Sequence, residues 1–534
     1  MRPSKALSEA LGHSLGSIGT RHGSGSRFLF FLGFVALVAL VAGCRVPLPP
    51  VPEPPSLVLL GGRVVDPESG LDAVRNLAID GGRIRAISEN ELTGHEVIDV
   101  SGLVVAPGFV DLHSHAQTPL GQHFQVLDGV TTALELESGS YPVAAMGTYP
   151  PIDIALHPLI NFGASVGHAW LRGQIIGGHE APTGIDDVYA RIRRGESAAA
   201  LDGPAFTQPL SPEQLPMLRA GLNRGLDQGG LGIGFLLDYM SEVVTDDEMQ
   251  VIFEVAASRK APIFVHIRRG IAGDPSGLLE VIAWAKKTGA PVHICHVQAN
   301  AMSAIEEFMA LIRQAQADGV QISTESFPYN AGSTSISAAV FSRNWQEIFD
   351  ITYEDVEWPA TGERFDEALW NRYRKEQPEG TVVHHYNREA WTRVATLAPD
   401  VAVASDGLPV LGSGSGVPPW GIGTFSRILG KYVREEKSLS LMDAVNKMSL
   451  LPAKILEGWA PALLRKGRVR VGADADLTIF NLATVTDHAT FGDPLQASTG
   501  IEYVLVGGKV VVRQGTLVEN VRPGQRVLAP LKDH

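Results

Sequence analysis

The sequence has little cysteine and little positive charge. Only two of its 534 residues are cysteine, Cys44 and Cys295. A framework of several disulfides, which holds many small secreted domains together, is therefore excluded. Lys and Arg number 44 against 58 Asp and Glu, which gives a formal net charge of −14. Since nucleic acid is bound through basic surfaces, this balance predicts no nucleic-acid partner.

The N-terminal segment lacks an apolar run of full membrane-spanning length. Residues 28–43 form an apolar run of 16 residues, whereas a spanning helix needs about 20. Basic residues precede it, and it ends in Val-Ala-Gly before Cys44, which resembles the lipobox of bacterial lipoproteins. We expect residues 1–44 to be a signal peptide with Cys44 as the lipidated residue; an uncleaved anchor is the alternative. Arg45 follows where an acidic residue would favour inner-membrane retention, so the expected location is the bacterial cell envelope, at the outer membrane facing the periplasm.

The remaining composition is that of a globular protein. Hydrophobic residues make up 45% and charged residues 19% of the chain, so general disorder is not expected. Residues 45–56 are proline-rich and predict a stiff, extended linker. Strand patterns follow at 57–65, 77–87 and 97–104, and others occur near the C-terminus at 475–481, 501–506 and 509–513. We expect residues 57–104 and 466–534 to build one small composite β-domain, of the β-sandwich type.

Residues 105–465 alternate between strand-like and helix-like patterns. Helical patterns at 246–260, 277–288 and 302–318 separate several short apolar runs, which lie at 161–166, 231–236, 262–265, 291–294, 320–324, 381–384 and 401–404. Alternation of this kind over more than 300 residues predicts an α/β fold with a parallel sheet, at this size a (β/α)8 TIM-like barrel. The active site of such a barrel lies at the C-terminal ends of its strands.

Histidine and aspartate residues occur where several of these strands are expected to end. His113 and His115 close the segment 106–115, and residues i and i+2 of a strand point to the same side. His266 and His296 end two further apolar runs, and Asp406 follows another. Imidazole and carboxylate ligands suit zinc or a similar divalent ion. The pattern therefore predicts one or two divalent metal ions at the strand ends.

Two glutamates in the second expected strand could supply a carboxylate between two metal ions. Glu135 and Glu137 both lie in the apolar segment 131–137, and buried carboxylates are usually paired or bound to metal. We expect Glu137, which is nearer the strand end, to be the ligand; the alternatives are Glu135, or an ion pair inside the barrel. We interpret Cys295 as a small buried residue.

The motifs as a group resemble the amidohydrolase superfamily, and within it the D-aminoacylases (N-acyl-D-amino-acid deacylases). The shared motifs are PGFVDLHSH, GVTT, VGH, HIR, CHV, FPYNAGST, SDGLP and GTFSRILGKYVRE. The resemblance covers nearly everything from residue 57 onward. It implies a metal-dependent hydrolase of a linear amide with Asp406 as general base, Tyr329 as a donor to the oxyanion and Ser333 in the substrate-contacting segment. His168 either orients the substrate or is a core histidine.

Three positions depart from the family pattern. Ser138 occupies the place of a cysteine ligand, Gln298 that of a lysine and Trp420 that of an arginine that binds the substrate carboxylate. We therefore expect Gln298 and Trp420 to contact a substrate whose carboxylate is masked, displaced or absent. The alternative is that Arg268 or Arg269 binds the carboxylate; as a further alternative both are solvated.

Two other functions remain possible from the sequence. A cyclic-amide hydrolase of the dihydroorotase or hydantoinase type would use a carboxylated lysine on the fourth strand, and residues 231–236 contain no lysine. A lipid-anchored binding protein without catalysis is the other alternative. Residues 341–379, rich in Trp and acidic residues, form an insertion that is either a lid or a surface excursion.

Overall fold

Eight parallel strands form the centre of the fold in the computed structural model, which describes residues 53–143, 158–177, 203–378, 380–412 and 416–531. Each strand pairs in parallel with its neighbour in the sheet. In sheet order they are β17 (Val401–Val403), β12 (Ile322–Ser326), β11 (Val292–Ile294), β10 (Ile263–Val265), β9 (Ile233–Phe235), β8 (Asn161–Gly167), β7 (Val130–Ser140) and β6 (Phe109–Asp111).

The first and last strands of this sheet meet just beyond their C-terminal ends. The backbone N–H of Asp406 donates to the carbonyl of His113 at 2.8 Å, and Ser114 and Gly407 form a parallel bridge. The sheet is thus a nearly closed barrel, and the expected (β/α)8 architecture is confirmed. Closure brings the segment after β6 beside the segment after β17, although nearly 300 residues separate them in the sequence.

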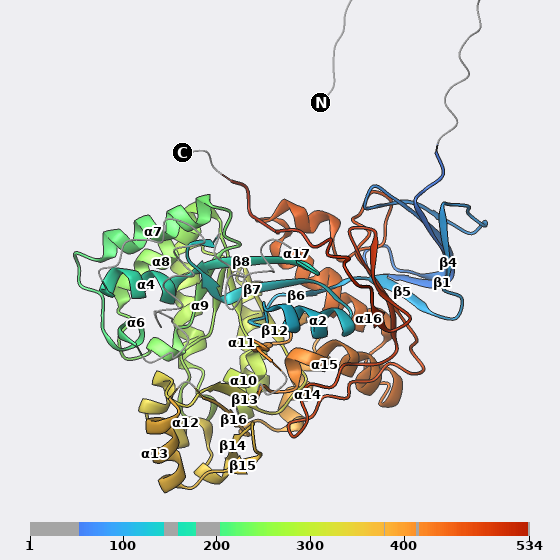
Figure 1. Cartoon of the computed structure of the whole chain (residues 1–534). Helices are drawn as coiled ribbons and strands as arrows, with labels where there is room; N and C mark the ends of the chain where they lie inside the picture. Colours follow the sequence, from blue (N-terminus) through green and yellow to red (C-terminus); the bar gives the residue numbers. More distant parts are fainter. Residues whose placement is uncertain (1–52, 144–157, 178–202, 379, 413–415, 532–534) are drawn as a thin grey trace, which may run out of the picture. The chain divides into compact units, whose positions relative to one another are not determined.

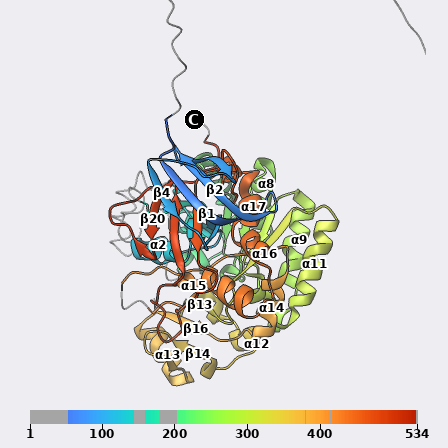
Figure 2. The same cartoon turned by 90° about the vertical axis from the view of Figure 1, so that its right-hand side faces the viewer.

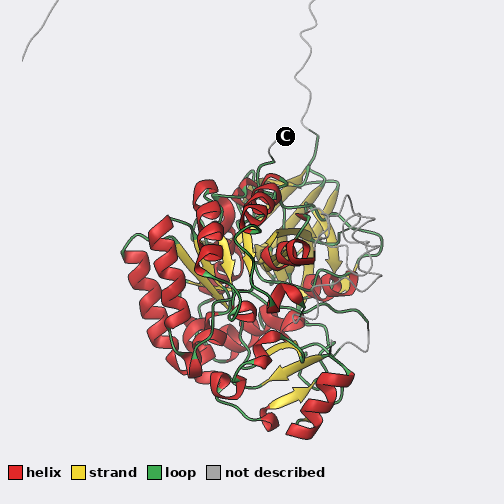
Figure 3. Ribbon diagram, turned by 90° about the vertical axis from the view of Figure 1, so that its left-hand side faces the viewer, coloured by secondary structure: helices red, strands yellow, loops and turns green. Residues whose placement is uncertain are grey.

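Helices cover the outside of the barrel (Figures 1 and 3). They are α2 (Pro119–Leu127), α4 (His168–Gly177), α6 (Pro204–Thr207), α7 (Leu215–Asp227), α8 (Asp246–Arg259), α9 (Ser276–Thr288), α10 (Val297–Ala301), α11 (Ile305–Ala317), α14 (Glu389–Leu397), α15 (Trp420–Arg427), α16 (Leu441–Val445) and α17 (Leu451–Glu457). Among the described residues no helix is long and apolar enough to cross a membrane.

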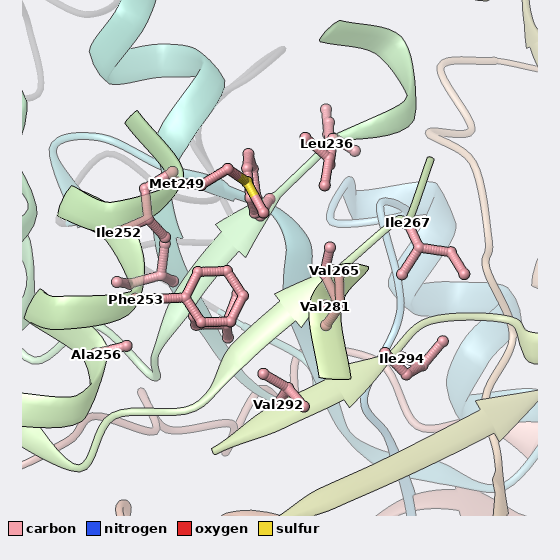
Figure 4. Close-up of a cluster of buried hydrophobic side chains, with 14 of the residues drawn as sticks. Leu236, Met249, Ile252, Phe253, Ala256, Val265, Ile267, Val281, Val292 and Ile294 are labelled. Carbon is pink, nitrogen blue, oxygen red and sulfur yellow. The ribbon is translucent and has the colours of Figure 1, made fainter. Parts of the chain in front are cut away.

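Helix α8 illustrates how the sequence fixes the outer layer. The Thr245 side chain caps its N-terminus by accepting from the Glu248 N–H, and acidic residues fill its first turn, both of which stabilise a helix start. Its buried side chains Met249, Ile252 and Phe253 belong to the same core cluster as residues of β10 and β11. Figure 4 shows these side chains packed with Val265 and Val292 in a cluster of buried apolar residues. This cluster holds the strands that carry His266 and His296.

Strands from both ends of the described chain join in one nine-stranded sheet. It contains β1 (Leu57–Asp66), β2 (Leu71–Asp80), β3 (Arg83–Ser88), β4 (Glu96–Asp99), β5 (Val104–Pro107), β18 (Leu477–Phe480), β19 (Ile501–Val506), β20 (Lys509–Arg513) and β21 (Thr516–Leu517). Figure 2 shows the N-terminal strands beside the C-terminal ones. The two ends are joined where β5 pairs antiparallel with β18, and β5 leads directly into the barrel strand β6.

A third sheet, antiparallel and four-stranded, corrects one sequence-based expectation. It contains β13 (Gly332–Ser335), β16 (Thr381–His384), β14 (Val356–Trp358) and β15 (Glu363–Arg364), with α12 (Trp345–Phe349) and α13 (Glu367–Glu376) nearby. The run at 381–384 was expected among the alternating barrel strands, but it pairs with β13 and β14 instead. A short buried apolar run fits either sheet, so its pattern alone does not select the partner.

Candidate metal centre

The residues expected at the strand ends lie together in the structure. Their nitrogen and oxygen atoms fall into overlapping groups in which all ligand-type atoms are within 4.8 Å of one another; the groups contain His113, His115, Glu137, His266, His296 and Asp406. Each residue lies at or just after the C-terminal end of β6, β7, β10, β11 or β17. Parallel strands bring these ends to one mouth of the barrel.

His113 and His115 face each other through ring nitrogens that carry lone pairs. Nδ1 of His113 lies 2.5 Å from Glu325 Oε1, and Nδ1 of His115 lies 2.8 Å from Glu135 Oε2. Because an ionised carboxylate only accepts hydrogen bonds, each Nδ1 holds a proton, and each Nε2 presents a lone pair when its ring is neutral, as a metal ligand must be. The two Nε2 atoms are nevertheless only 3.1 Å apart.

Two carboxylate oxygens complete this convergence of acceptors. Asp406 Oδ1 lies 3.2 Å and Glu137 Oε2 lies 3.3 Å from His113 Nε2. When both rings are neutral, four electron-pair donors meet here, and they repel each other unless a cation lies between them. The donor set, two imidazoles and two carboxylates, is one that zinc and related divalent ions accept. The residues present therefore fit a divalent metal ion.

Glu137 links this group to a second pair of histidines. Its Oε1 atom lies 2.9 Å from His266 Nδ1 and 2.8 Å from His296 Nε2, while its Oε2 atom faces His113. Glu135 contacts His115 from the far side of the ring and hydrogen-bonds the Ser138 backbone and hydroxyl at 3.3 Å. The geometry favours Glu137 over Glu135 as the carboxylate between two metal positions. Ser138 lies behind the cluster.

Exposure within the cluster is greatest at His115 and Asp406. The side chains of His113, Glu137, His266 and His296 are at most 5% exposed, whereas those of His115 and Asp406 are 16% and 19% exposed. Water and substrate can therefore approach where Asp406 lies. A carboxylate at the open side is placed to exchange protons with an incoming molecule.

Glu325 supports His113 from inside the barrel. It accepts from His113 and also faces His293, whose Nε2 lies 3.1 Å away. Burial would raise the pKa of Glu325, but its close contacts with His113 and His293 lower that pKa to about 2. Glu325 is therefore a buried partner of two histidines and also a neighbour of the metal-ligand candidate His113. Cys295 is buried beside His113 and Glu325.

Asp111 connects the two strand ends that carry His113 and Asp406. Its carboxylate accepts from the His113 and Ser405 backbone N–H groups at 3.2 and 3.0 Å and from the Ser405 hydroxyl at 2.5 Å. Sequence reasoning missed this residue. An acidic side chain inside an apolar strand, two residues before the first histidine, was the signal that could have identified it.

Two members of the cluster have backbone conformations that are rare for residues with a side chain. His296 has φ +33° and Asp406 has φ +53°, in the left-handed region that mainly glycine adopts. Such conformations cost of order 1–3 kcal/mol and concentrate at functional sites. The turns after β11 and β17 direct both side chains into the barrel mouth.

Three of the four residues that the sequence suggested as substrate contacts use their polar groups in hydrogen bonds within the described part of the protein, and Tyr329 is the exception. Tyr329 is buried, its hydroxyl has no partner among the described residues, and burial raises its pKa well above the usual value. Trp420 is 1% exposed and donates its Nε1–H to the Asp406 carbonyl at 2.8 Å. Gln298 is buried and donates to the Phe327 carbonyl. The Ser333 hydroxyl donates to the Val382 carbonyl at 2.9 Å.

His168 lies in a buried ion-pair cluster apart from the four metal-ligand groups. Its Nε2 lies 2.7 Å from Glu248 Oε1, and Arg172 donates to the same carboxylate. All three side chains have no exposed surface. The structure thus favours the interpretation of His168 as a core histidine over one in which it orients substrate.

Comparison with known proteins identifies the family of this chain. The model of the amidohydrolase family matches residues 96–512. N-acyl-D-glutamate deacylase of Alcaligenes xylosoxydans xylosoxydans is 31% identical over 88% of this chain and 96% of its own length. N-acyl-D-aspartate deacylase of the same organism is 28% identical, and a dihydroorotase of Geotalea daltonii is 24% identical.

Solved structures share the fold. The crystal structure of N-acyl-D-glutamate deacylase from Bordetella bronchiseptica, complexed with zinc and a phosphonate inhibitor, superposes with a TM-score of 0.73 at 25% identity, over 89% of this chain and all of that one. A D-aminoacylase structure gives 0.72 at 23% identity over the same shares. The chain is a member of the amidohydrolase family, homologous to the D-aminoacylases.

Proposed function

We propose that the protein is a metal-dependent hydrolase that deacylates N-acyl amino acids, as its deacylase relatives are named for doing. The observation that carries the proposal is the convergence of His113, His115, Glu137 and Asp406 as acceptors around one point. His266 and His296, which contact the other oxygen of Glu137, would be the residues that hold a second ion. The cofactor is one or two divalent ions, Zn²⁺ in the first place.

The residues of the cluster define the chemistry. A bound divalent ion lowers the pKa of a water molecule towards neutrality and polarises the scissile carbonyl. Asp406 is the exposed carboxylate of the cluster, so it accepts the proton of the attacking water. It then returns that proton to the leaving amine, which must be protonated before it departs. The Trp420 N–H holds the Asp406 carbonyl and so fixes the turn that presents the carboxylate.

The resemblance to the D-aminoacylases supports Tyr329 as the hydrogen-bond donor to the developing oxyanion. Its buried hydroxyl is free of protein acceptors in the described chain, and its raised pKa keeps the proton in place at neutral pH. The Arg427 guanidinium lies over its ring at 4.7 Å and hydrogen-bonds the Pro328 carbonyl. A donor that is held before the reaction needs no reorganisation during it.

A substrate screen tests the proposed function. Purified protein is loaded with Zn²⁺ and incubated with matched N-acetyl-D- and N-acetyl-L-amino acids, and with dihydroorotate and hydantoins as cyclic amides. We expect amine release from the N-acyl amino acids and none from the cyclic amides, since β9 carries no lysine. Hydrolysis of the cyclic amides alone would replace the deacylase assignment. Metal binding without any hydrolysis would support a binding protein.

We further propose that the enzyme is a lipoprotein of the cell envelope. The support is the sequence alone, a 16-residue apolar run that ends at Cys44; these residues lie outside those that the structure describes. Cys44→Ser is expected to leave the precursor unprocessed and without lipid label in cells fed a radiolabelled fatty acid. Cleavage of the wild-type chain at another position, to a protein without lipid, would contradict the proposal.

A further inference from the structure

Three charged side chains form a buried cluster beside His266. They are Asp238, at the start of the short helix η3 (Asp238–Met240), Arg269, three residues after His266, and Arg343, which follows the short helix η6 (Ala339–Ser342). Their side chains are 0%, 7% and 13% exposed. Asp238 Oδ2 lies 3.7 Å from His266 Nε2. The cluster therefore adjoins the metal centre on the side of β9 and β10.

These three side chains comprise two positive charges and one negative charge. Arg343 donates to Asp238 Oδ1 at 2.7 Å, while the Arg269 side chain reaches only Oδ2 of the same carboxylate, at 3.4 Å. The Nε atoms of both arginines have no acceptor among the described residues. Two guanidinium groups thus share one carboxylate, and buried charges are normally paired. Within these three described side chains Asp238 balances only one of the two positive charges, and the more distant Glu137 adds a favourable charge interaction with Arg269.

Arg269 is held in place by its surroundings. Its backbone N–H donates to Asp238 at 2.9 Å, and its guanidinium lies 5.2 Å from the Phe349 ring and 5.8 Å from the Tyr386 ring. Phe349 and Arg343 both come from the insertion at 341–379. The insertion therefore contributes side chains that pack beside the metal centre.

The neighbouring Arg268 has a different environment. It donates to the Glu280 carboxylate at 3.0 Å and to the backbone carbonyls of Ser241 and Val244. Its hydrogen-bonding capacity is used within the protein. Of the two consecutive arginines, only Arg269 has a charge that is incompletely matched and lies near a metal-ligand candidate.

We propose that Arg269, with Asp238 and Arg343 behind it, binds a carboxylate on the amino-acid half of the substrate. The inference rests on the proposed deacylase function. It supplies the positive charge that is absent at Gln298 and Trp420, and it replaces the expectation of a masked or absent carboxylate. An arginine is suited to this because its planar fork pairs with both oxygens of a carboxylate.

The substrate carboxylate can be the α-carboxylate or one in the side chain. N-acetyl-D-glutamate contains both, and its α-amide and γ-amide each remove one charge while the scissile amide stays the same. Wild-type protein is expected to have a kcat/KM for the diacid roughly 10- to 100-fold above that for one of the two amides, the range of one charge-assisted contact. If the α-amide is the poorer substrate, Arg269 binds the α-carboxylate; if the γ-amide is the poorer substrate, Arg269 binds the side-chain carboxylate.

Variants separate Arg269 from its neighbour. In Arg269→Met, we expect the preference for the diacid to fall to about one, mainly through KM. Arg269→Lys, which keeps a point charge but loses the fork, retains part of the preference. Arg268→Met is the matched control: it leaves the ratio at the wild-type value even where stability drops. The melting temperatures of all three variants show whether each is folded. If Arg269→Met does not fold, the substrate preference of Arg269→Lys tests the proposal in its place.

The outcomes distinguish the two proposals. Hydrolysis of all three substrates at equal rates, or an unchanged ratio in both Arg269 variants, overturns the anion site and leaves the deacylase assignment standing. An equal loss in Arg268→Met also overturns it, because the effect is then not specific to Arg269. No hydrolysis of any N-acyl amino acid by the zinc-loaded wild type overturns both proposals.

Discussion

Exchanging Glu137 and Glu135 in turn for glutamine tests the geometry of the metal centre. The two glutamates are two residues apart on β7, both face the barrel mouth, and each substitution is isosteric. Glu137 contacts His266 and His296 at 2.9 and 2.8 Å with one oxygen and His113 at 3.3 Å with the other. Glu135 instead accepts from the Nδ1 side of His115 and from Ser138.

The size of each effect follows from these contacts. Loss of a partner that orients a metal ligand from behind typically costs 10- to 100-fold in metal affinity. We expect Glu135→Gln to fall in that range. Glu137→Gln removes a charged ligand and directs an amide N–H₂ at one pair of histidines, so its loss must exceed about 100-fold. It should also lower the bound zinc by at least one ion per chain.

Metal content and affinity are measured on the same samples. Elemental analysis after dialysis gives the stoichiometry, and competition with a chromogenic chelator gives the dissociation constant. Far-ultraviolet circular dichroism confirms that both variants fold. Wild-type affinity and stoichiometry in Glu137→Gln, together with a large loss in Glu135→Gln, would refute the reasoning and make Glu135 the bridging carboxylate.

Two further predictions concern catalysis and stability. Asp406→Asn removes the proton acceptor at the open side, so kcat should fall by about 10²- to 10⁴-fold at saturating zinc; an unchanged kcat assigns the base elsewhere. Burial lowers the pKa of Lys447 from 10.5 to about 7, so the folded state binds fewer protons than the unfolded state between those values. Stability from this residue therefore rises with pH across that window, by about 1.4 kcal/mol per unit. The melting-temperature difference between wild type and Lys447→Met should shift in favour of wild type from pH 7.5 to 9.5; a constant difference contradicts this.

The sequence predicted the location of the site because a parallel barrel leaves little freedom there. Once His113, His266, His296 and Asp406 follow buried strands, closure of the sheet must bring those strand ends to one mouth. The run at 381–384 shows the limit of this reasoning, since a short apolar strand does not reveal which sheet it joins. The strand bounds at 501–506 and 509–513 agree with β19 and β20 because a Gly-Gly turn marks their junction.

The residues around the cluster could not be assigned from the sequence because their roles depend on distant partners. Glu325 acts through His113, which is 212 residues away, and Asp111 acts through Ser405, which is 294 residues away. Arg268 and Arg269 are adjacent and chemically identical in the sequence. Only the tertiary contacts show that Arg268 is committed to Glu280, whereas Arg269 turns towards Asp238.

The metal dependence of amine release tests the central claim most directly. N-acetyl-D-amino acids are incubated with one protein preparation before chelation, after removal of metal, and after addition of stoichiometric Zn²⁺. The account predicts amine release by the loaded protein, loss on chelation and recovery with zinc. The same rate with and without metal, or no release by the fully loaded protein, would contradict it.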